Sequence, residues 1–375
     1  MSIFILVAAI IAAVLIECRI YERHWDDGVT ARIGFGVDRT VEGGASELVE
    51  VVEHGGRMRL PWLSVKFQAS KYLSLPQEDN ANVTDNYYRE DVFCIRPGER
   101  ITRRLPIVCE KRGIHSIGAI DLISRDMFMV ERLVTNLPGH ATITVFPKQV
   151  DVSDIVFDAR RTMGDFITKK RTIEDPFVFR GLRDYVEGDD PRSINWRASA
   201  KTDRMTVNQY ESTTSLCASI WLNCENGTGW FDEIVSEESI RIASSLAASL
   251  IDSGVPVSFC TNGRDFYTQA EVKHIPGGCS QQHLDNINTA LARIELGLKP
   301  RRMDSAAEDM LALSATEDFI VIISADLDPR LIARASSLRE SGREVLWIAP
   351  VRRDDTRDMD ELSAIPNHYV WRAKL

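Results

Sequence analysis

The segment RDYVEGDDPRSINWRASAKTDRM, residues 183–205, brings acids, arginines and a tryptophan together at close spacing. The run EGDDP at 187–191 predicts a turn. Asp190 is a suitable N-cap, and Pro191 suits the first position of a short helix that continues to about Ala200. The segment is too polar for a core, so its side chains are candidates for chemistry or for binding.

Arginines and carboxylates of this segment can form two-bond ion pairs, which fix geometry more than they add stability. The candidate partners are Arg183, Arg192 and Arg197 with Asp184, Glu187, Asp189 or Asp190. Two hypotheses follow: a self-paired linker that joins two domains, or a docking or catalytic surface. Catalysis would need Asp189 and Asp190 as acid and base, although adjacent acids beside arginine are more simply explained by salt bridges. Trp196 is expected to pack inward.

A second set of polar side chains follows two apolar runs farther along the chain. Asn223, Glu225 and Thr228 come after the first run, and Ser324, Asp326 and Asp328 come after the second. Oxygen ligands from two strand ends are what Mg²⁺ or Ca²⁺ requires. Because acidic residues are common in loops, solvated turn residues are the alternative explanation.

The sequence lacks the common motifs of nucleotide-binding, metalloprotease and serine-hydrolase sites. No GK[ST] or GxGxxG loop follows a predicted strand, no HExxH lies on a predicted helix, and no GxSxG elbow follows a strand. Nucleotide-binding and hydrolase functions therefore lack their simplest support.

The elements that position these strand-end residues alternate between strand and helix after residue 212. Strands are predicted at 216–223, 255–263, 318–327 and 343–350, and helices at about 240–251, 281–296 and 329–340. Such alternation predicts a parallel sheet with helices on both faces, in which ligands bind at the carboxyl ends of the strands. The loops after Leu222, Cys260 and Ser324 are the places to look for a site.

Residues 29–148 instead favour strands. Short runs rich in β-branched and aromatic residues lie between Gly, Pro and Asn turns, at 43–56, 60–70, 99–113 and 140–148. Six to eight strands fit one immunoglobulin-like β-sandwich, whose expected role is that of a spacer or docking module. Its histidines, His54, His115 and His140, are expected to be exposed loop residues.

The first sixteen residues, MSIFILVAAIIAAVLI, carry no charged side chain. At 1.5 Å per residue, a helix of this length is about 24 Å long, somewhat short of the ~30 Å hydrocarbon core, so local thinning is required. The run favours an uncleaved membrane anchor over a cleaved signal peptide or a soluble core helix, and it lacks a lipobox before Cys18. Arg19 and Arg23 follow it, which places the bulk of the chain in the cytoplasm by the positive-inside tendency.

The amino-acid composition disfavours further classes of protein. A net charge of −10 disfavours a general nucleic-acid binder. Seven scattered cysteines without CxxC spacing indicate neither a disulfide framework nor a zinc site, and reduced thiols are expected.

The run RGLRDYVEGDDPRSINWRASAKTDRMTVNQYE, residues 180–211, closely resembles the signature of the domain-of-unknown-function 58 family. A weaker similarity covers 110–132, where His115, Met127 and Met129 depart from the family pattern. The resemblance covers most of the chain and weakens after about residue 270. The signature positions, taken as partner-binding or interdomain residues, are Arg183, Tyr185, Gly188, Asp189, Arg192, Trp196 and Ser199.

The resemblance implies a von Willebrand factor A-like α/β domain. It also implies that the gene for this chain lies beside genes for MoxR-type AAA+ ATPases and transglutaminase-like membrane proteins. It assigns no enzymatic activity. Metal sites of von Willebrand A domains open with D-x-S-x-S, whereas this chain has Asn223-x-Glu225-x-Gly227. The changed motif disfavours a metal site of the usual kind, although Asn223, Glu225 and Asp326 stay candidate ligands, with Mg²⁺ as the possible ion.

The expected organisation is an anchor at 1–20, a β-sandwich at 29–149, a signature segment at 150–211 and an α/β domain at 212–375. The leading hypothesis is a membrane-anchored, non-enzymatic scaffold that binds a protein partner, an AAA+ ATPase, in envelope-related assembly. The alternatives are a divalent-metal-dependent ligand-binding domain and an envelope-remodelling hydrolase.

Overall fold

The computed structural model describes residues 2–74, 81–83, 86–126, 128–129, 131–170, 179–186, 194–202, 204–210, 217–225, 232–313, 319–355, 362 and 365–373. The chain forms two compact units. Unit 1 contains residues 1–149 with 264–269 and 288–295, and unit 2 contains the rest. Each unit is described by itself below.

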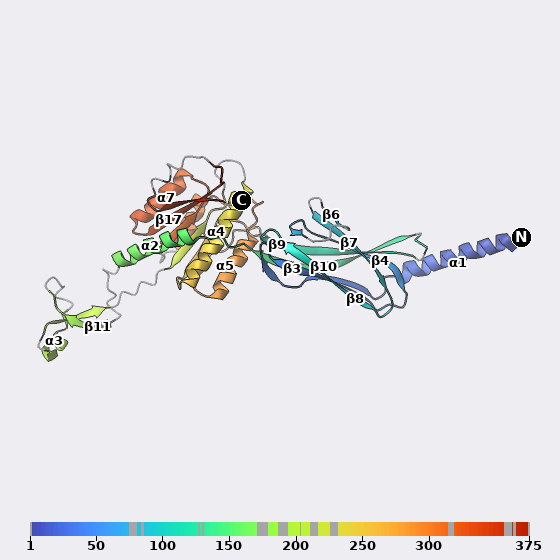
Figure 1. Cartoon of the computed structure of the whole chain (residues 1–375), viewed down its shortest axis with the longest axis horizontal. Coiled ribbons are helices and arrows are strands. Elements are labelled where there is room, and N and C mark those ends of the chain that lie inside the picture. Colours follow the sequence, from blue (N-terminus) through green and yellow to red (C-terminus); the bar gives the residue numbers. More distant parts are fainter. Residues whose placement is uncertain are drawn as a thin grey trace. The chain divides into compact units, whose positions relative to one another are not determined.

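Unit 1 begins with helix α1, Ser2–His24, and continues as a β-sandwich (Figure 1). One sheet has the strand order β1-β3-β8-β5 and the other β2-β10-β9-β4-β7-β6. The strands are β1 Val29–Phe35, β2 Arg39–Val41, β3 Ala45–His54, β4 Leu60–Ser70, β5 Leu73–Ser74, β6 Ala81–Val83, β7 Asn86–Ile95, β8 Arg100–Cys109, β9 Gly113–Arg125 and β10 Arg132–Phe146.

Alternation of side chains explains why these segments pair as a sandwich. In β8 every second residue from Leu105 onward is buried, and β3 alternates in the same way. One face of each sheet therefore contributes to a shared core that includes Leu48, Phe67 and Ile143. The described part of the chain has ten strands here, more than the six to eight predicted, because short strands such as β2 and β5 carry too few residues for a period.

Two of the three histidine predictions for this unit are wrong. His54 lies in β3 and is 1% exposed, and His115 lies in β9 and is 6% exposed. Each ring contacts a backbone carbonyl four residues away in sequence, that of Met58 or Lys111. Each bond fixes one ring nitrogen inside the sandwich, so neither histidine is an exposed loop residue, and the Nδ1 atom of His54 is buried without a hydrogen-bond partner among the described residues. His140 is exposed, in β10 rather than a loop.

Helix α1 has two parts with different surroundings. Its apolar side chains before Glu17 are largely exposed, as in Phe4 at 82% and Ile11 at 54%. Near its end, Tyr21 and Trp25 are 2% and 3% exposed and belong to the sandwich core. The Tyr21 hydroxyl hydrogen-bonds the Ser124 hydroxyl at 2.7 Å. The helix is long and apolar enough to cross a membrane, and its last turns are part of the folded domain.

Unit 2 contains a six-stranded sheet in the order β15-β14-β13-β16-β17-β18. Its strands are β13 Ala218–Leu222, β14 Val257–Thr261, β15 Ile275–Gly278, β16 Phe319–Ile323, β17 Glu344–Val351 and β18 His368–Arg372. All neighbours are parallel except β15, which pairs antiparallel with β14. The central strands are buried at every position, as expected of a sheet covered on both faces.

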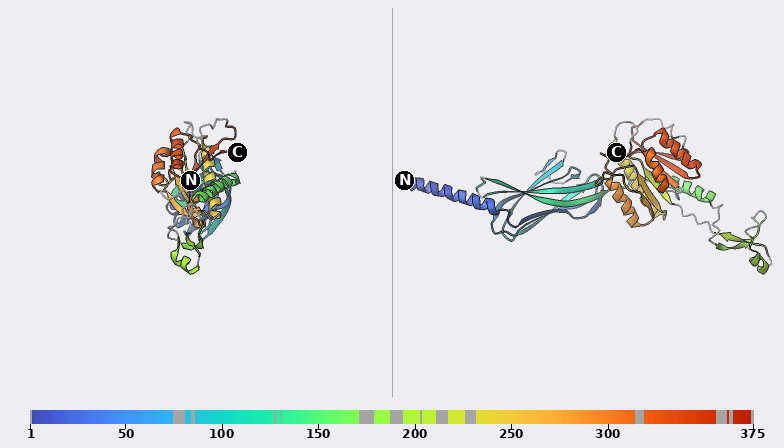
Figure 2. Two further views of the ribbon diagram at one scale, coloured as in Figure 1. Left: turned by 90° about the vertical axis from the view of Figure 1, so that its left-hand side faces the viewer. Right: turned by 180° about the vertical axis from the view of Figure 1, so that it is seen from behind.

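Helices cover this sheet (Figure 2). They are α2 Ser153–Lys170, α4 Glu233–Asp252, α6 Met303–Leu313 and α7 Pro329–Glu340. A further helix, α5 Gln281–Arg293, begins in unit 2 and ends among the residues of unit 1. Helices α6 and α7 share a core with Trp221, Ile320 and Trp347. The predicted strand and helix alternation is present, and α2, α6, β15 and β18 are additions that the sequence did not predict.

Candidate functional site

The signature segment folds around a small antiparallel pair of strands, β11 Phe179–Asp184 and β12 Thr206–Tyr210. Helix α3, Trp196–Thr202, lies between them in sequence. Ile194 forms an isolated bridge with Val207, and both side chains are buried. These two residues give the segment an apolar centre of its own.

Short polar side chains hold α3 against β12. The Asn195 side chain accepts a hydrogen bond from the Ala198 N–H at 3.0 Å and donates one to the Asn208 side-chain oxygen at 2.7 Å. The Ser199 hydroxyl donates to the Asn195 carbonyl and accepts from the Thr206 N–H, each at 2.9 Å. Ser199, predicted for binding, therefore joins helix to strand, and Asn195, which the sequence analysis missed, caps the helix.

Trp196 points into solvent, with 66% of its surface exposed, and the expectation that it packs inward is wrong. Ile194 and Val207, which pair across the segment, are buried in its interior instead, and the indole of Trp196 at the start of α3 lies outside that pair. Exposed apolar side chains lie on the same segment at Leu182, Val186 and Met205, 46%, 62% and 47% exposed. We call these four residues the signature patch. Large exposed apolar side chains on one segment are a common feature of interaction surfaces.

The other signature residues divide into described and undescribed positions. Arg183 is exposed and donates to the Asp184 carbonyl, while Tyr185 is half-buried and its N–H donates to the Met205 carbonyl. Gly188, Asp189 and Arg192 lie outside the described residues, as do the turn at 187–191 and the start of the predicted helix.

The second candidate site lies at the carboxyl edge of the unit 2 sheet, where the sequence analysis expected it. Asn223, Asn262 and Ser324 follow β13, β14 and β16 and are at most 4% exposed. The Asn223 amide donates to the Ser324 hydroxyl at 3.0 Å, and the Asn262 amide donates to the Asn223 side-chain oxygen at 2.8 Å. Three strand ends are thus tied together by buried polar groups.

Two half-buried carboxylates, those of Glu225 and Asp326, lie two residues after Asn223 and Ser324 in the chain. Burial raises the pKa of Glu225, and the nearby charge of Asp326 raises it further. Burial likewise raises the pKa of Asp326, with Asp328 adding to the effect. The arrangement favours a positively charged neighbour, because each acid pays a desolvation cost that a cation offsets.

The predicted metal ligands fit a divalent cation poorly. The Asn223 side-chain oxygen already accepts from the Glu225 N–H and from Asn262, which uses both of its lone pairs. One Glu225 oxygen accepts from the Met303 N–H at 2.7 Å. The Arg302 guanidinium, held by Asp304 at 3.0 Å, supplies positive charge that lowers the pKa of both acids. Arg302, which the sequence analysis missed, therefore offsets part of the negative charge that an ion would offset, although the pKa values of both acids stay raised.

Unit 2 also has a cavity of about 460 Å³ bordered by α2, α7, β17 and β18. Its lining mixes Asp158 and Glu344 with Arg161 and Arg339. Because these two acids and two arginines balance in charge, the cavity has no net preference for an anion or a cation.

Residues 181–361 match the profile of the family described as "Protein of unknown function DUF58". The match confirms the resemblance over these residues, and it extends well past residue 270, after which the signature resemblance weakens. The upstream similarity at 110–132 lies outside it. No curated protein matches the chain.

Solved structures similar to parts of the chain include a CARDB domain from Pyrococcus furiosus, with 14% identity and a TM-score of 0.23 over 32% of this chain and 97% of that one. A non-cellulosomal cohesin from Archaeoglobus fulgidus has 10% identity and a TM-score of 0.21 over 34% and 96%. A cohesin module from a Clostridium perfringens family 33 glycoside hydrolase has 11% identity and a TM-score of 0.21 over 30% and 97%.

Proposed function

We propose that this chain is a membrane-anchored, non-enzymatic adaptor that binds a protein partner through its signature patch. The observation that carries the proposal is Trp196, an exposed tryptophan on a segment whose polar contacts hold it in place. Tryptophan is the residue type most enriched among those that dominate binding energy at interfaces. Leu182, Val186 and Met205 supply apolar surface on the same segment.

The partner we propose is a MoxR-type AAA+ ATPase, acting with this chain in envelope-related assembly. This step depends on the resemblance of residues 180–211 to the DUF58 family, which the profile match over 181–361 supports. The α/β domain of unit 2 would then be a von Willebrand A-like interaction module. Its mostly parallel sheet with helical cover is compatible with that fold.

We propose that α1 crosses the membrane and that the two units lie in the cytoplasm. The exposed apolar stretch before Glu17 supports insertion, and Arg19 and Arg23 after it support the orientation. Protease protection in sealed vesicles of known sidedness tests this orientation. Cleavage of both units from the cytoplasmic face is expected, and their protection there would reverse it.

Affinity purification from native membranes, with and without ATP, tests the adaptor function. The intact chain should recover an AAA+ ATPase, and Trp196→Ala should lower the recovery at least tenfold, because a central interface tryptophan contributes about 2 kcal/mol or more. Phe157→Ala is the matched control, since Phe157 is an aromatic residue 69% exposed on α2, outside the signature patch.

The melting temperature of Trp196→Ala should stay within the error of the intact chain, because truncating an exposed side chain removes little packing. Equal recovery by Trp196→Ala and the intact chain would contradict docking through the signature patch. Absence of any ATPase from the intact chain's eluate would contradict the proposed partner.

A divalent-metal-dependent ligand-binding domain is the second candidate, favoured by the raised pKa values of Glu225 and Asp326. Because Arg302 already provides positive charge and Asn223 has no vacant lone pair, we expect Mg²⁺ to leave the melting temperature unchanged. A saturable rise, equivalent to about 2.7 kcal/mol at 100-fold excess over the dissociation constant, would favour this candidate instead.

A further inference from the structure

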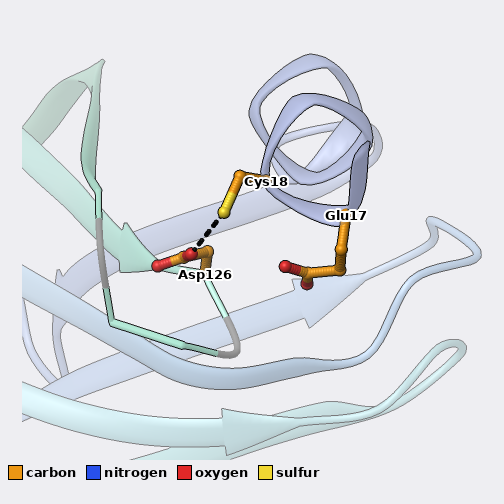
Figure 3. A group of neighbouring side chains, drawn as sticks. All are labelled: Glu17, Cys18 and Asp126. Carbon is orange, nitrogen blue, oxygen red and sulfur yellow. Dashed lines mark hydrogen bonds between the residues drawn. The ribbon is translucent and has the colours of Figure 1, made fainter. Parts of the chain in front are cut away.

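Glu17, Cys18 and Asp126 form a cluster where α1 meets the sandwich, far from both candidate sites in sequence (Figure 3). One potential ligand atom from each residue lies within 4.8 Å of the other two. Cys18 and Asp126 are 9% and 2% exposed. All three belong to unit 1, so the cluster is formed inside one compact body.

Within the cluster, Cys18 and Asp126 are hydrogen-bonded to each other, whereas one carboxylate oxygen of Glu17 has no partner in the described part of the chain. The Cys18 thiol donates to one Asp126 oxygen at 3.0 Å, and the other Asp126 oxygen accepts from the Glu131 N–H at 3.2 Å. The Oε2 atom of Glu17 is buried from solvent and has no hydrogen-bond partner among the described residues. A buried carboxylate oxygen without a donor is costly, and a bound cation would remove that cost.

We propose that Glu17, Cys18 and Asp126 bind a borderline divalent cation of the Zn²⁺ type. A thiolate with two carboxylates is a mixed sulfur and oxygen set, which suits Zn²⁺ better than Mg²⁺ or Ca²⁺. Three protein ligands leave a fourth tetrahedral position for water. The Glu131 N–H orients Asp126 as an outer hydrogen bond orients a metal ligand.

Binding exchanges a proton for the metal. The Cys18 S–H bond breaks, its proton passes to solvent, and the thiolate sulfur and one Asp126 oxygen both bind the cation in place of their shared hydrogen bond. Glu17 gains the partner that its Oε2 atom lacks. Because the thiol must deprotonate, affinity should increase with pH. The metal would fasten the end of α1 to the loop after β9.

The test uses the full chain, purified in detergent and stripped of metal. Co²⁺ should produce sulfur-to-cobalt charge-transfer absorption with a stoichiometry of one, and Zn²⁺ should abolish that band and raise the melting temperature by several degrees. Cys18→Ser should remove the band, and Glu17→Gln should weaken Co²⁺ binding at least tenfold. These variants keep side-chain size, so metal-free melting temperatures and circular dichroism spectra like those of the intact chain should verify that both variants are folded.

Two matched controls separate this site from adventitious binding. Cys94→Ser removes an exposed cysteine of the same unit, and Glu22→Gln removes an exposed acid of the same helix, and both should bind Co²⁺ like the intact chain. The proposal is overturned if the intact chain shows no charge-transfer band, if Cys18→Ser retains it, or if Cys94→Ser abolishes it. In those cases the role of the Cys18 thiol is structural, through its hydrogen bond to Asp126.

Discussion

At the scale of single residues, the least expected feature is an acid inside the sandwich. Glu50 of β3 is 1% exposed, and neither of its carboxylate oxygens has a hydrogen-bond donor among the described residues. Asp91 of β7 is close by and is bound by Arg89 at 2.5 Å and Arg103 at 2.6 Å. Those contacts satisfy Asp91, so Glu50 is stabilised in its protonated form, in which it can donate to Asp91.

Burial, together with the charge of Asp91, raises the pKa of Glu50 from about 4.5 to about 8. The folded state therefore holds this proton more tightly than the unfolded state. The resulting stability is complete below pH 4.5, declines as pH rises toward 8, and is constant above that. For the intact chain we expect the free energy of unfolding to fall by roughly 2–5 kcal/mol over this window from Glu50 alone.

Glu50→Gln should lose this pH dependence and be more stable than the intact chain at pH 9, because an amide donates to Asp91 without ionising. Urea unfolding followed by tryptophan fluorescence at pH 5, 7 and 9 measures it. Glu53→Gln is the matched control, since Glu53 on the same strand is only partly buried and pairs with Arg100. Parallel pH profiles for Glu50→Gln and the intact chain would contradict the assignment.

At the scale of elements, helix ends are secured by side chains distant in sequence. Asp232, the N-cap of α4, accepts from the Ile234 and Val235 N–H groups. The Arg352 guanidinium, beyond the end of β17, donates to both Asp232 oxygens, at 2.5 Å and 3.2 Å. One carboxylate therefore caps a helix and links it to the sheet.

Asp232→Ala should lower the free energy of unfolding by about 1–2 kcal/mol, since it removes the cap and leaves Arg352 without this carboxylate. Asp232→Asn should recover most of the loss, because an amide oxygen still caps the helix but makes no ion pair. Urea denaturation of both variants measures the difference. Equal losses for Ala and Asn would assign the effect to the ion pair and contradict the capping role.

At the scale of the whole molecule, α1 belongs to two environments. Its apolar stretch suits a bilayer, whereas Tyr21 and Trp25 are part of the sandwich core. Removing residues 2–16 should therefore release the chain from membranes while its fold is preserved. Removing residues 2–27 should also destabilise unit 1, because each buried aromatic side chain contributes roughly 1.5–3 kcal/mol.

Fractionation of cells that express each truncation, followed by thermal unfolding of the released proteins, measures both effects. The shorter truncation should melt close to the detergent-purified intact chain, and the longer one clearly below it. Retention of the shorter truncation in the membrane fraction would show a second membrane contact, and equal melting of the two truncations would contradict the structural role of Tyr21 and Trp25.

Local spacing of side chains was enough to determine the apolar helix, most long strands of the sandwich and the strand and helix alternation of unit 2. Periodicity records which side chains share a face, and this information lies within a few residues of sequence. The carboxyl-edge location of Asn223, Glu225 and Asp326 followed from the same pattern, because parallel strands end at one edge.

Only the tertiary structure decided which groups meet across the chain. Cys18 and Asp126 are 108 positions apart, and Glu50 meets Asp91 from the opposite sheet. Arg302 lies beside Glu225, and His54 and His115 are buried on the inward faces of β3 and β9. Contacts of this kind depend on which strands pair and which faces are covered. Local spacing determines an element's faces, while tertiary packing determines what each face contacts.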